Sequence, residues 1–277
     1  MGVVESATMK RCGLIFAMIF VGALLPGCGP LPPVKLKTVS LAKTIDYDNL
    51  AAVLDRALDK RGYVAPTLMS DVEGKLLAQL QQLAKLGPTT APAQLPSLGQ
   101  RLAYWYNARA AWSIYLAMDL HRAKRKTVVG LTSRSFPLDG QRLTLADIDA
   151  KLYALAGLEA VIAAPSMNEH RAELPRKPFD PKTIQQEIAR RFNSYIGDRG
   201  RFIIDIETQQ IRFAPIFWQY RTEILRWHNK LYGAPQATLS TALLPRVTGL
   251  AGYRLQQAVG YKCVQDTKPA ELTITGD

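Results

Sequence analysis

Residues 103–112 read AYWYNARAAW, and they set four aromatic rings, one amide and one guanidinium among small alanines. The stretch lies within a predicted helix over 98–121, in which two neighbouring stripes of side chains are both largely apolar. A helix that is apolar nearly all round is buried on every side. We therefore expect this helix to form the centre of the fold, with Asn107 and Arg109 buried.

These two polar side chains need partners, because an unpaired buried amide costs about 1–3 kcal/mol. For Asn107 we expect a structural role, in which the amide ties the backbone of a loop to the helix; the alternative is an amide that binds a ligand. For Arg109 we expect an ion pair, with Asp147 or Asp149 as the partner. A contact with an aromatic face, or a path to the surface, would also satisfy Arg109. The alternative is an anion-binding arginine in a pocket.

The patterns outward from this helix predict one α+β domain over residues 45–267, mostly helical, with short β-hairpins around the central helix. Ser70 and Glu73 are spaced as a capping box, and Asp139-Gly140 is typical of a tight hairpin turn. Residues 268–277 are predicted as a C-terminal tail. Helices are expected at about 47–61, 70–87, 98–121, 145–156, 180–196, 215–231 and 238–259, and strands near 128, over 136–145, over 201–215 and over 261–265.

Residues 9–28, MKRCGLIFAMIFVGALLPGC, combine two basic residues, a short apolar run and a small residue before a cysteine. The apolar run is shorter than the roughly 20 residues that span a membrane, so it indicates a secretory signal. Gly27 before Cys28 resembles the lipobox of bacterial lipoproteins. That resemblance implies that residues 1–27 are a signal peptide and that Cys28 is the lipid attachment site; the alternative is an ordinary cleaved signal.

A chain anchored in this way would lie in the bacterial cell envelope and face the periplasm. Residues 28–44 comprise the lipidated cysteine and a proline-rich basic segment, which we expect to be a tether. Gly29 stands where enteric lipoproteins of the inner membrane carry aspartate, so the resemblance favours the outer membrane. The first expected partner is therefore the lipid bilayer, reached through acylated Cys28.

The formal net charge of +12 favours anionic partners. For an exported protein we expect an anionic envelope polymer or a phospholipid surface, and no nucleic acid. Once the signal is removed, Cys263 is the only cysteine besides Cys28, so no internal disulfide is expected. Cysteines and histidines do not cluster at metal-ligand spacing, and we expect neither a metal nor a cofactor.

Three segments together resemble the family called domain of unknown function 547. They are LAYWYNARAA (102–111), DGQRLTLADID (139–149) and IRFAPIFWQY (211–220). Trp105 and Asn107 match the first family motif, whereas Arg109 and Ala110 stand where the family has tyrosine and asparagine. The stretch AVIAAPSMNEH (160–170) lacks the cysteine that many members carry there. The resemblance implies a shared fold over about 45–267 and no settled activity.

Catalytic candidates are few. Glu169 and His170, in the polar stretch NEHR (168–171), are the one place where a carboxylate and a histidine adjoin, and they are candidates for a general acid–base pair. Adjacent residues seldom point together, and no nucleophile lies nearby in the sequence. We therefore expect a binding or structural protein of the envelope. The alternative is a hydrolase or transferase that acts on an envelope polymer or peptide through a 547-type pocket.

Overall fold

Helix α4 (Leu98–Arg122) is the centre of the computed structural model, which describes residues 33–36 and 44–275. Every residue from Ala103 to Trp112 is buried. The helix begins at a capping box, in which Ser97 accepts from the backbone of Gln100 and the Gln100 side chain accepts from the backbone of Ser97. The expected central buried helix is thus confirmed.

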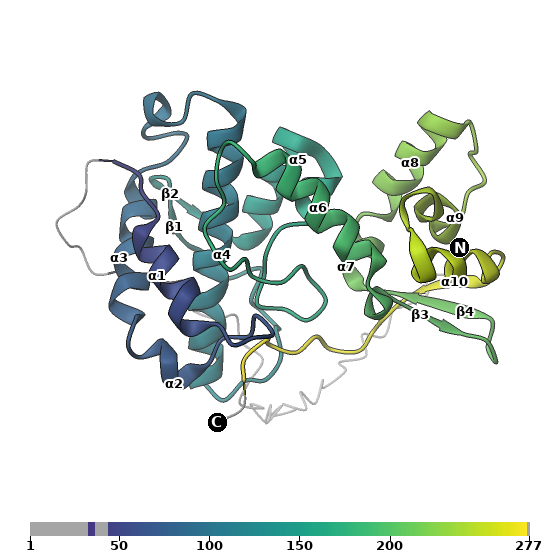
Figure 1. Cartoon of the computed structure of the whole chain (residues 1–277), viewed down its shortest axis with the longest axis horizontal. Helices are drawn as coiled ribbons and strands as arrows, with labels where there is room; N and C mark the ends of the chain where they lie inside the picture. Colours follow the sequence, from purple (N-terminus) through teal and green to yellow (C-terminus); the bar gives the residue numbers. More distant parts are fainter. Residues whose placement is uncertain (1–32, 37–43, 276–277) are drawn as a thin grey trace, which may run out of the picture. The chain divides into compact units, whose positions relative to one another are not determined.

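Other helices pack around α4 (Figure 1). Helix α3 (Glu73–Lys85) contacts α4 and also α1 (Asp48–Ala57), which in turn contacts the short α2 (Pro66–Met69). Helices α5 (Leu145–Ile162) and α6 (Ile184–Gly197) also contact α4 and each other. The remaining helices are α7 (Pro215–Gln219), α8 (Arg221–Tyr232), α9 (Leu239–Leu243) and α10 (Gly249–Gln257), with 3-10 turns η1 (Pro92–Gln94), η2 (Arg199–Arg201) and η3 (Leu244–Arg246).

Two small sheets complete the described part of the chain. Strands β1 (Phe136–Leu138) and β2 (Gln141–Leu143) form an antiparallel hairpin, whose turn residues Asp139 and Gly140 both have positive φ, as a tight primed turn requires. Strands β3 (Phe202–Asp205) and β4 (Gln210–Phe213) form a second hairpin, to which β5 (Lys262–Gln265) adds in parallel. The expected fold class, α+β and mostly helical with short hairpins, is confirmed.

The capping box predicted at Ser70 and Glu73 is wrong. Ser70 has helical backbone angles and closes α2, where its hydroxyl donates to the carbonyl of Thr67. A residue held in that conformation cannot take the extended backbone of an N-cap. Val72 occupies the N-cap position of α3 instead and provides no side-chain hydrogen bond.

Several predicted elements end earlier or break. Helix α1 stops at Ala57, because Leu58 is extended and pairs with Val64. The helix predicted over 215–231 is two helices, broken at Tyr220, and the segment 238–259 is α9, a 3-10 turn and α10. Val128 begins no strand; its amide makes a single backbone hydrogen bond, to Ala270.

Segments near both ends of the predicted domain lie against its body. Within the tether predicted at 28–44, Val34 is buried and its amide donates to Ser135. Within the tail predicted at 268–277, backbone pairing joins Glu271 to Thr127, Leu272 to Asn168 and Ile274 to Val64. The lipobox, Cys28 and the signal segment lie outside the described residues.

No helix in the described ranges has the length and hydropathy needed to span a bilayer.

Candidate functional site

The chain between α5 and α6, residues 163–183, contains no helix or strand. A connection longer than about 15 residues without regular structure is uncommon inside a domain and usually serves a function. Here four polar side chains hold it against the helices around it. Asn107, Arg109, Arg171 and Arg191 make these contacts, and we refer to residues 163–183 as the braced loop.

Asn107 fixes the far end of the braced loop. Its amide nitrogen donates to the carbonyl of Phe179 at 3.1 Å, and its amide oxygen accepts from the backbone N–H of Phe179 at 2.8 Å. The buried amide of Asn107 thus satisfies both backbone hydrogen-bonding groups of the buried residue Phe179. The expected tie between Asn107 and a loop backbone is confirmed.

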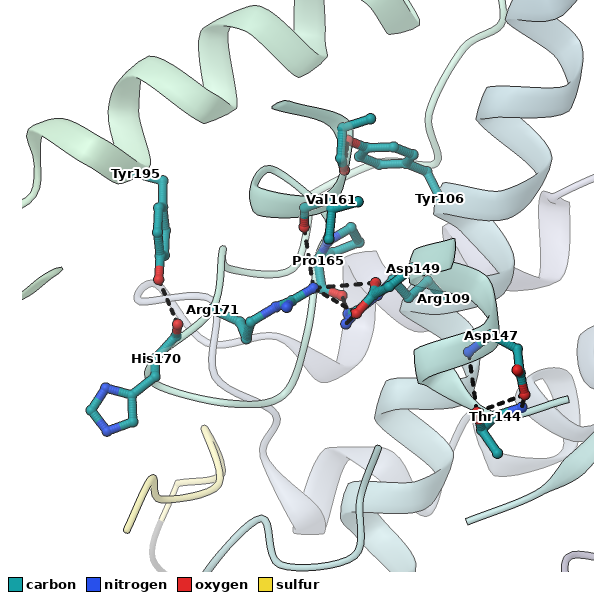
Figure 2. Close-up of polar contacts among 11 residues, drawn as sticks. Tyr106, Arg109, Thr144, Asp147, Asp149, Val161, Pro165, His170, Arg171 and Tyr195 are labelled. Atoms are coloured by element: carbon teal, nitrogen blue, oxygen red, sulfur yellow. Dashed lines mark hydrogen bonds and ion pairs between the residues drawn. The ribbon is translucent and has the colours of Figure 1, made fainter. Parts of the chain in front are cut away.

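Arg109 fixes the near end through an ion pair. Its Nε lies 2.7 Å from Oδ1 of Asp149 and its Nη2 lies 3.2 Å from Oδ2, while Nη1 donates to the carbonyl of Pro165 (Figure 2). Of the two partners expected for Arg109, Asp149 is confirmed. Asp147 instead forms the capping box of α5 with Thr144.

Arg171 shares the same carboxylate from the other side. Its Nη2 lies 3.2 and 3.1 Å from the two oxygens of Asp149, and it also donates to the carbonyl of Val161 at 3.1 Å (Figure 2). All three charged side chains of this cluster are buried. Because two arginines share one aspartate, the cluster keeps one uncompensated positive charge.

The electrostatics of the cluster follow from burial and from this shared pairing. Burial alone raises the pKa of Asp149, but the charges and hydrogen bonds of Arg109 and Arg171 outweigh it and hold that pKa below its usual value. Burial also lowers the pKa of Arg109, against the attraction of Asp149. Asp149 is therefore ionised at neutral pH and serves as the counter-ion that stabilises the cluster.

Arg191 of α6 holds the middle of the braced loop. Its Nε donates to the carbonyl of Ala163 at 3.0 Å, its Nη2 donates to the carbonyl of Glu173, and its guanidinium lies 5.4 Å from the ring centre of Phe179. No carboxylate of the described residues forms an ion pair with it, and burial lowers its pKa from the usual value. Arg191 is thus a buried cation without a carboxylate.

Glu169 and His170 do not hydrogen-bond each other through their side chains. His170 Nε2 lies 3.7 Å from Glu169 Oε1, beyond hydrogen-bond distance, and Oε1 accepts instead from the amide of Glu271 at 3.2 Å. The imidazole points away from the Asp149 cluster (Figure 2). Cys263 is half-buried beside Ser240 and Tyr261, with Sγ 3.6 Å from the Ser240 hydroxyl.

The braced loop forms one wall of a pocket of about 730 Å³, a size typical of ligand sites. The other walls are the turn at residues 60–62, helix α6, and the two residues Asp198 and Arg201. Seven cationic and four anionic side chains line the described pocket: Lys60, Arg61, Arg176, Lys177, Arg190, Arg191 and Arg201, against Glu173, Asp180, Glu187 and Asp198. The lining therefore carries a net charge of 7 − 4 = +3.

The lining cations differ in burial, and Arg201 is half-buried. Five lining cations are exposed, and we call them the rim cations: Lys60, Arg61, Arg176, Lys177 and Arg190. Arg191 and its neighbour Tyr195 are buried lining residues and form the floor. The Tyr195 hydroxyl donates to the carbonyl of His170 at 2.5 Å, and its ring stacks under Arg201 at 4.5 Å.

Asn107, Arg109, Glu169 and His170 are absent from the lining of this described pocket. The candidate residues predicted from the sequence therefore do not line the pocket. Asn107 and Arg109 instead hydrogen-bond the braced loop, which forms one of its walls. Sequence reasoning missed the pocket cations, because they are scattered as KRG (60–62), RK (176–177), RR (190–191) and RGR (199–201). Each pair alone is typical of a solvated surface.

Comparisons with known proteins give no relative: no family model matches the chain, and neither a curated sequence nor a solved structure matches it. Among the described residues no group of histidine, cysteine and acidic side chains is arranged to hold a metal ion.

Proposed function

We propose that this protein is a lipid-anchored binding protein of the bacterial cell envelope, and that it holds an anionic ligand in the cationic pocket. One observation carries the proposal: the pocket lining has an excess of three positive charges, and its buried arginine has no carboxylate partner. A concave site with several unneutralised cations attracts anions and concentrates them. An anionic envelope polymer or a phospholipid headgroup has the required charge.

Anion binding is tested on the full-length chain in a neutral detergent, with soluble peptidoglycan fragments and with vesicles of phosphatidylglycerol or phosphatidylcholine. We expect binding to an anionic probe that weakens in the double variant Arg176→Gln/Lys177→Gln. The matched control is Arg226→Gln/Lys230→Gln, which removes two exposed cations from α8, outside the pocket. Equal weakening in both double variants would show only nonspecific charge attraction and would count against the proposal.

The anchor rests on the signal pattern at residues 9–28. Metabolic labelling with palmitate should mark the wild-type chain and the Cys12→Ala variant, but not Cys28→Ala. Cys12 is the matched control, because it lies in the apolar run of the same signal. Equal labelling of Cys28→Ala would refute lipidation at this site. Fractionation of the labelled chain would assign it to the outer membrane, which we favour, or to the inner membrane.

The alternative is a hydrolase or transferase that acts on an envelope polymer or peptide. A general acid or base must lie within hydrogen-bond reach of the group that it serves, and Glu169 and His170 lie outside the pocket lining. Turnover of peptidoglycan fragments, peptides or esters that is lost in His170→Ala would favour the enzyme. Membership of the 547 family stays a proposal, based on the three segments quoted above.

A further inference from the structure

The three buried arginines of the described chain differ in their counter-ions. Arg109 and Arg171 both pair with Asp149, whereas Arg191 is 8% exposed and pairs only with backbone carbonyls. Taking a charge out of water is costly unless an opposite charge compensates it. Arg191 is also the one of the three that lines the pocket. Its missing counter-ion can therefore enter from the pocket.

The guanidinium of Arg191 keeps donors for such a counter-ion. Nε and Nη2 are used by Ala163 and Glu173, while Nη1 has no hydrogen-bond partner among the described residues. Nη1 is not fully buried, so solvent can reach it from the pocket. Its two N–H groups are therefore available to an oxygen acceptor in the pocket.

The acidic side chains nearby are already engaged elsewhere or are turned away. Glu187 forms a two-pronged ion pair with Arg190, at 2.8 and 2.6 Å. Asp198 pairs with Arg201 at 3.0 Å. Glu173 is exposed, and its carboxylate lies beside Gly62, 3.9 Å from where a Cβ of that residue would stand. Asp180, the fourth acid of the lining, accepts from the amide of Lys182 at 2.9 Å. None of the four forms an ion pair with Arg191.

We propose that the ligand ends in a carboxylate or phosphate group, and that this group pairs with the Arg191 guanidinium at the floor of the pocket. This inference rests on the proposed anion-binding function and adds the chemistry of the bound group. The rim cations attract the ligand from solution, while the buried arginine recognises its acidic end. Hydrogen bonds to charged groups are stronger than neutral ones, and partial burial of the arginine strengthens them further.

The first variant adds a carboxylate instead of removing the arginine. Ser194 is exposed, lines the pocket and follows Arg191 by three residues on α6, so Ser194→Glu places a tethered acidic group on the same helix face. We expect it to compete with the ligand and to weaken binding roughly tenfold or more, as the loss of a charged hydrogen bond implies. Asn193→Glu is the matched control, with an equal charge at an exposed position outside the lining.

The probes are inorganic phosphate, glycerol phosphate and an N-acetylated dipeptide with a free carboxylate, titrated calorimetrically into the full-length chain in neutral detergent. Phosphatidic acid vesicles form a fourth arm that separates a lipid headgroup from the free phosphate ester. Weakening in Ser194→Glu and in Arg191→Gln, with Asn193→Glu and Arg226→Gln, an exposed arginine of α8 outside the lining, close to wild type, supports the proposal. Arg191→Lys keeps the charge and should bind better than Arg191→Gln.

Unchanged binding in a folded Ser194→Glu chain would overturn the role of Arg191, whatever the stability of Arg191→Gln. Binding of anionic polymers or vesicles that does not depend on Arg191 would also overturn it, and would leave the proposed function standing. A wild-type chain that binds none of the anionic probes would overturn both proposals.

Discussion

Asn107 is a buried amide that hydrogen-bonds both backbone groups of one residue, Phe179. Phe179 lines the pocket and lies beneath the guanidinium of Arg191. A single side chain in the central helix therefore sets the position of a pocket residue 72 positions later in the sequence.

Removing this amide should cost stability directly. Asn107→Ala leaves the N–H and C=O of Phe179 unpaired in a buried site, and we expect the free energy of unfolding to fall by about 1–3 kcal/mol. Urea denaturation measures the loss. Asn193→Ala, at an exposed position of α6, is the control and should stay within about 0.5 kcal/mol of wild type. If both variants unfold like wild type, the braced loop does not depend on Asn107.

Two variants of Arg109 should separate the contribution of its apolar stem to stability from that of its charge. Arg109→Met keeps part of the stem packing, so we expect it to lose less stability than Arg109→Ala. Both variants break a buried ion pair, which costs about 3–5 kcal/mol when the remaining charge is orphaned. Arg171 still compensates Asp149 here, so we expect the lower end of that range.

Urea unfolding of both variants measures this order, and Arg190→Met on the surface of α6 is the control. An Arg109→Met chain that is less stable than Arg109→Ala would contradict the role assigned to the stem. Loss of anion binding with unchanged stability would place Arg109 in a site rather than in the fold.

Predictions for single residues were confirmed where a polar side chain lies in an apolar helix and therefore needs a partner. Asn107 and Arg109 stand in an apolar helix, so their need for partners follows from the sequence, and Asp149 was one of two expected acids. Arg171 and Arg191 gave no such signal, because each stands among other charged residues in a polar stretch. Only the tertiary fold shows that they are buried.

Helix α5 illustrates how a single glycine shapes an element. Gly157 has φ 75° and ψ −163°, which breaks the helical geometry inside Leu145–Ile162; the part after the break contains Val161, whose carbonyl accepts from Arg171. These angles lie in a region that is essentially open to glycine alone. The sequence predicted this helix to end at about 156, one residue before the kink.

Gly157→Ala should destabilise the protein by about 1–3 kcal/mol, because alanine cannot adopt these angles without strain. No atom lies within 4 Å of the added Cβ, so the loss would report backbone strain alone. Gly197→Ala is the matched control, since its Cβ also meets no atom and its φ is not positive. Thermal melts compare the two, and an equal effect at both sites would argue against strain at Gly157.

Elements with a regular period were predictable and irregular ones were not. The stripe of α4 and the Asp139-Gly140 turn gave the central helix and the first hairpin. The segments after residue 214 also have helical apolar spacing, so the sequence predicted continuous helices there. The structure breaks them at Tyr220 and at the 3-10 turn that contains Pro245. The braced loop has no period at all, and so the pocket could not be foreseen.

At the scale of the whole molecule, four tyrosines are buried or nearly so and have raised pKa values, namely Tyr47, Tyr104, Tyr106 and Tyr195. Burial raises the pKa of Tyr195 to about 12, against the attraction of Arg201. An acid whose pKa is higher in the folded state binds its proton more tightly there than in the unfolded chain, where the pKa is about 10.

Stability should therefore fall as the pH rises from about 10 to 12, because the unfolded chain releases its tyrosine protons first. Each such tyrosine contributes up to about 1.4 kcal/mol per pH unit in that window. Tyr195→Phe should show a shallower alkaline decline than wild type, and Tyr253→Phe, which removes an exposed ring, should show the same decline as wild type. Urea unfolding between pH 8 and 12 measures the slopes, and identical slopes in all three chains would contradict the assigned pKa.

The pairing of residues 271–275 with the body of the domain has a consequence for the order in which the protein is made. Val64 donates its amide to Thr273 and accepts from the amide of Thr275, a partner 211 positions further on. A ribosome completes helices α1 to α10 before it reaches these residues. The segments at Val64, Thr127 and Asn168 therefore have no such backbone partners until the residues after α10 have been made. A chain that ended after α10 would leave the backbone groups of these three segments without their partners.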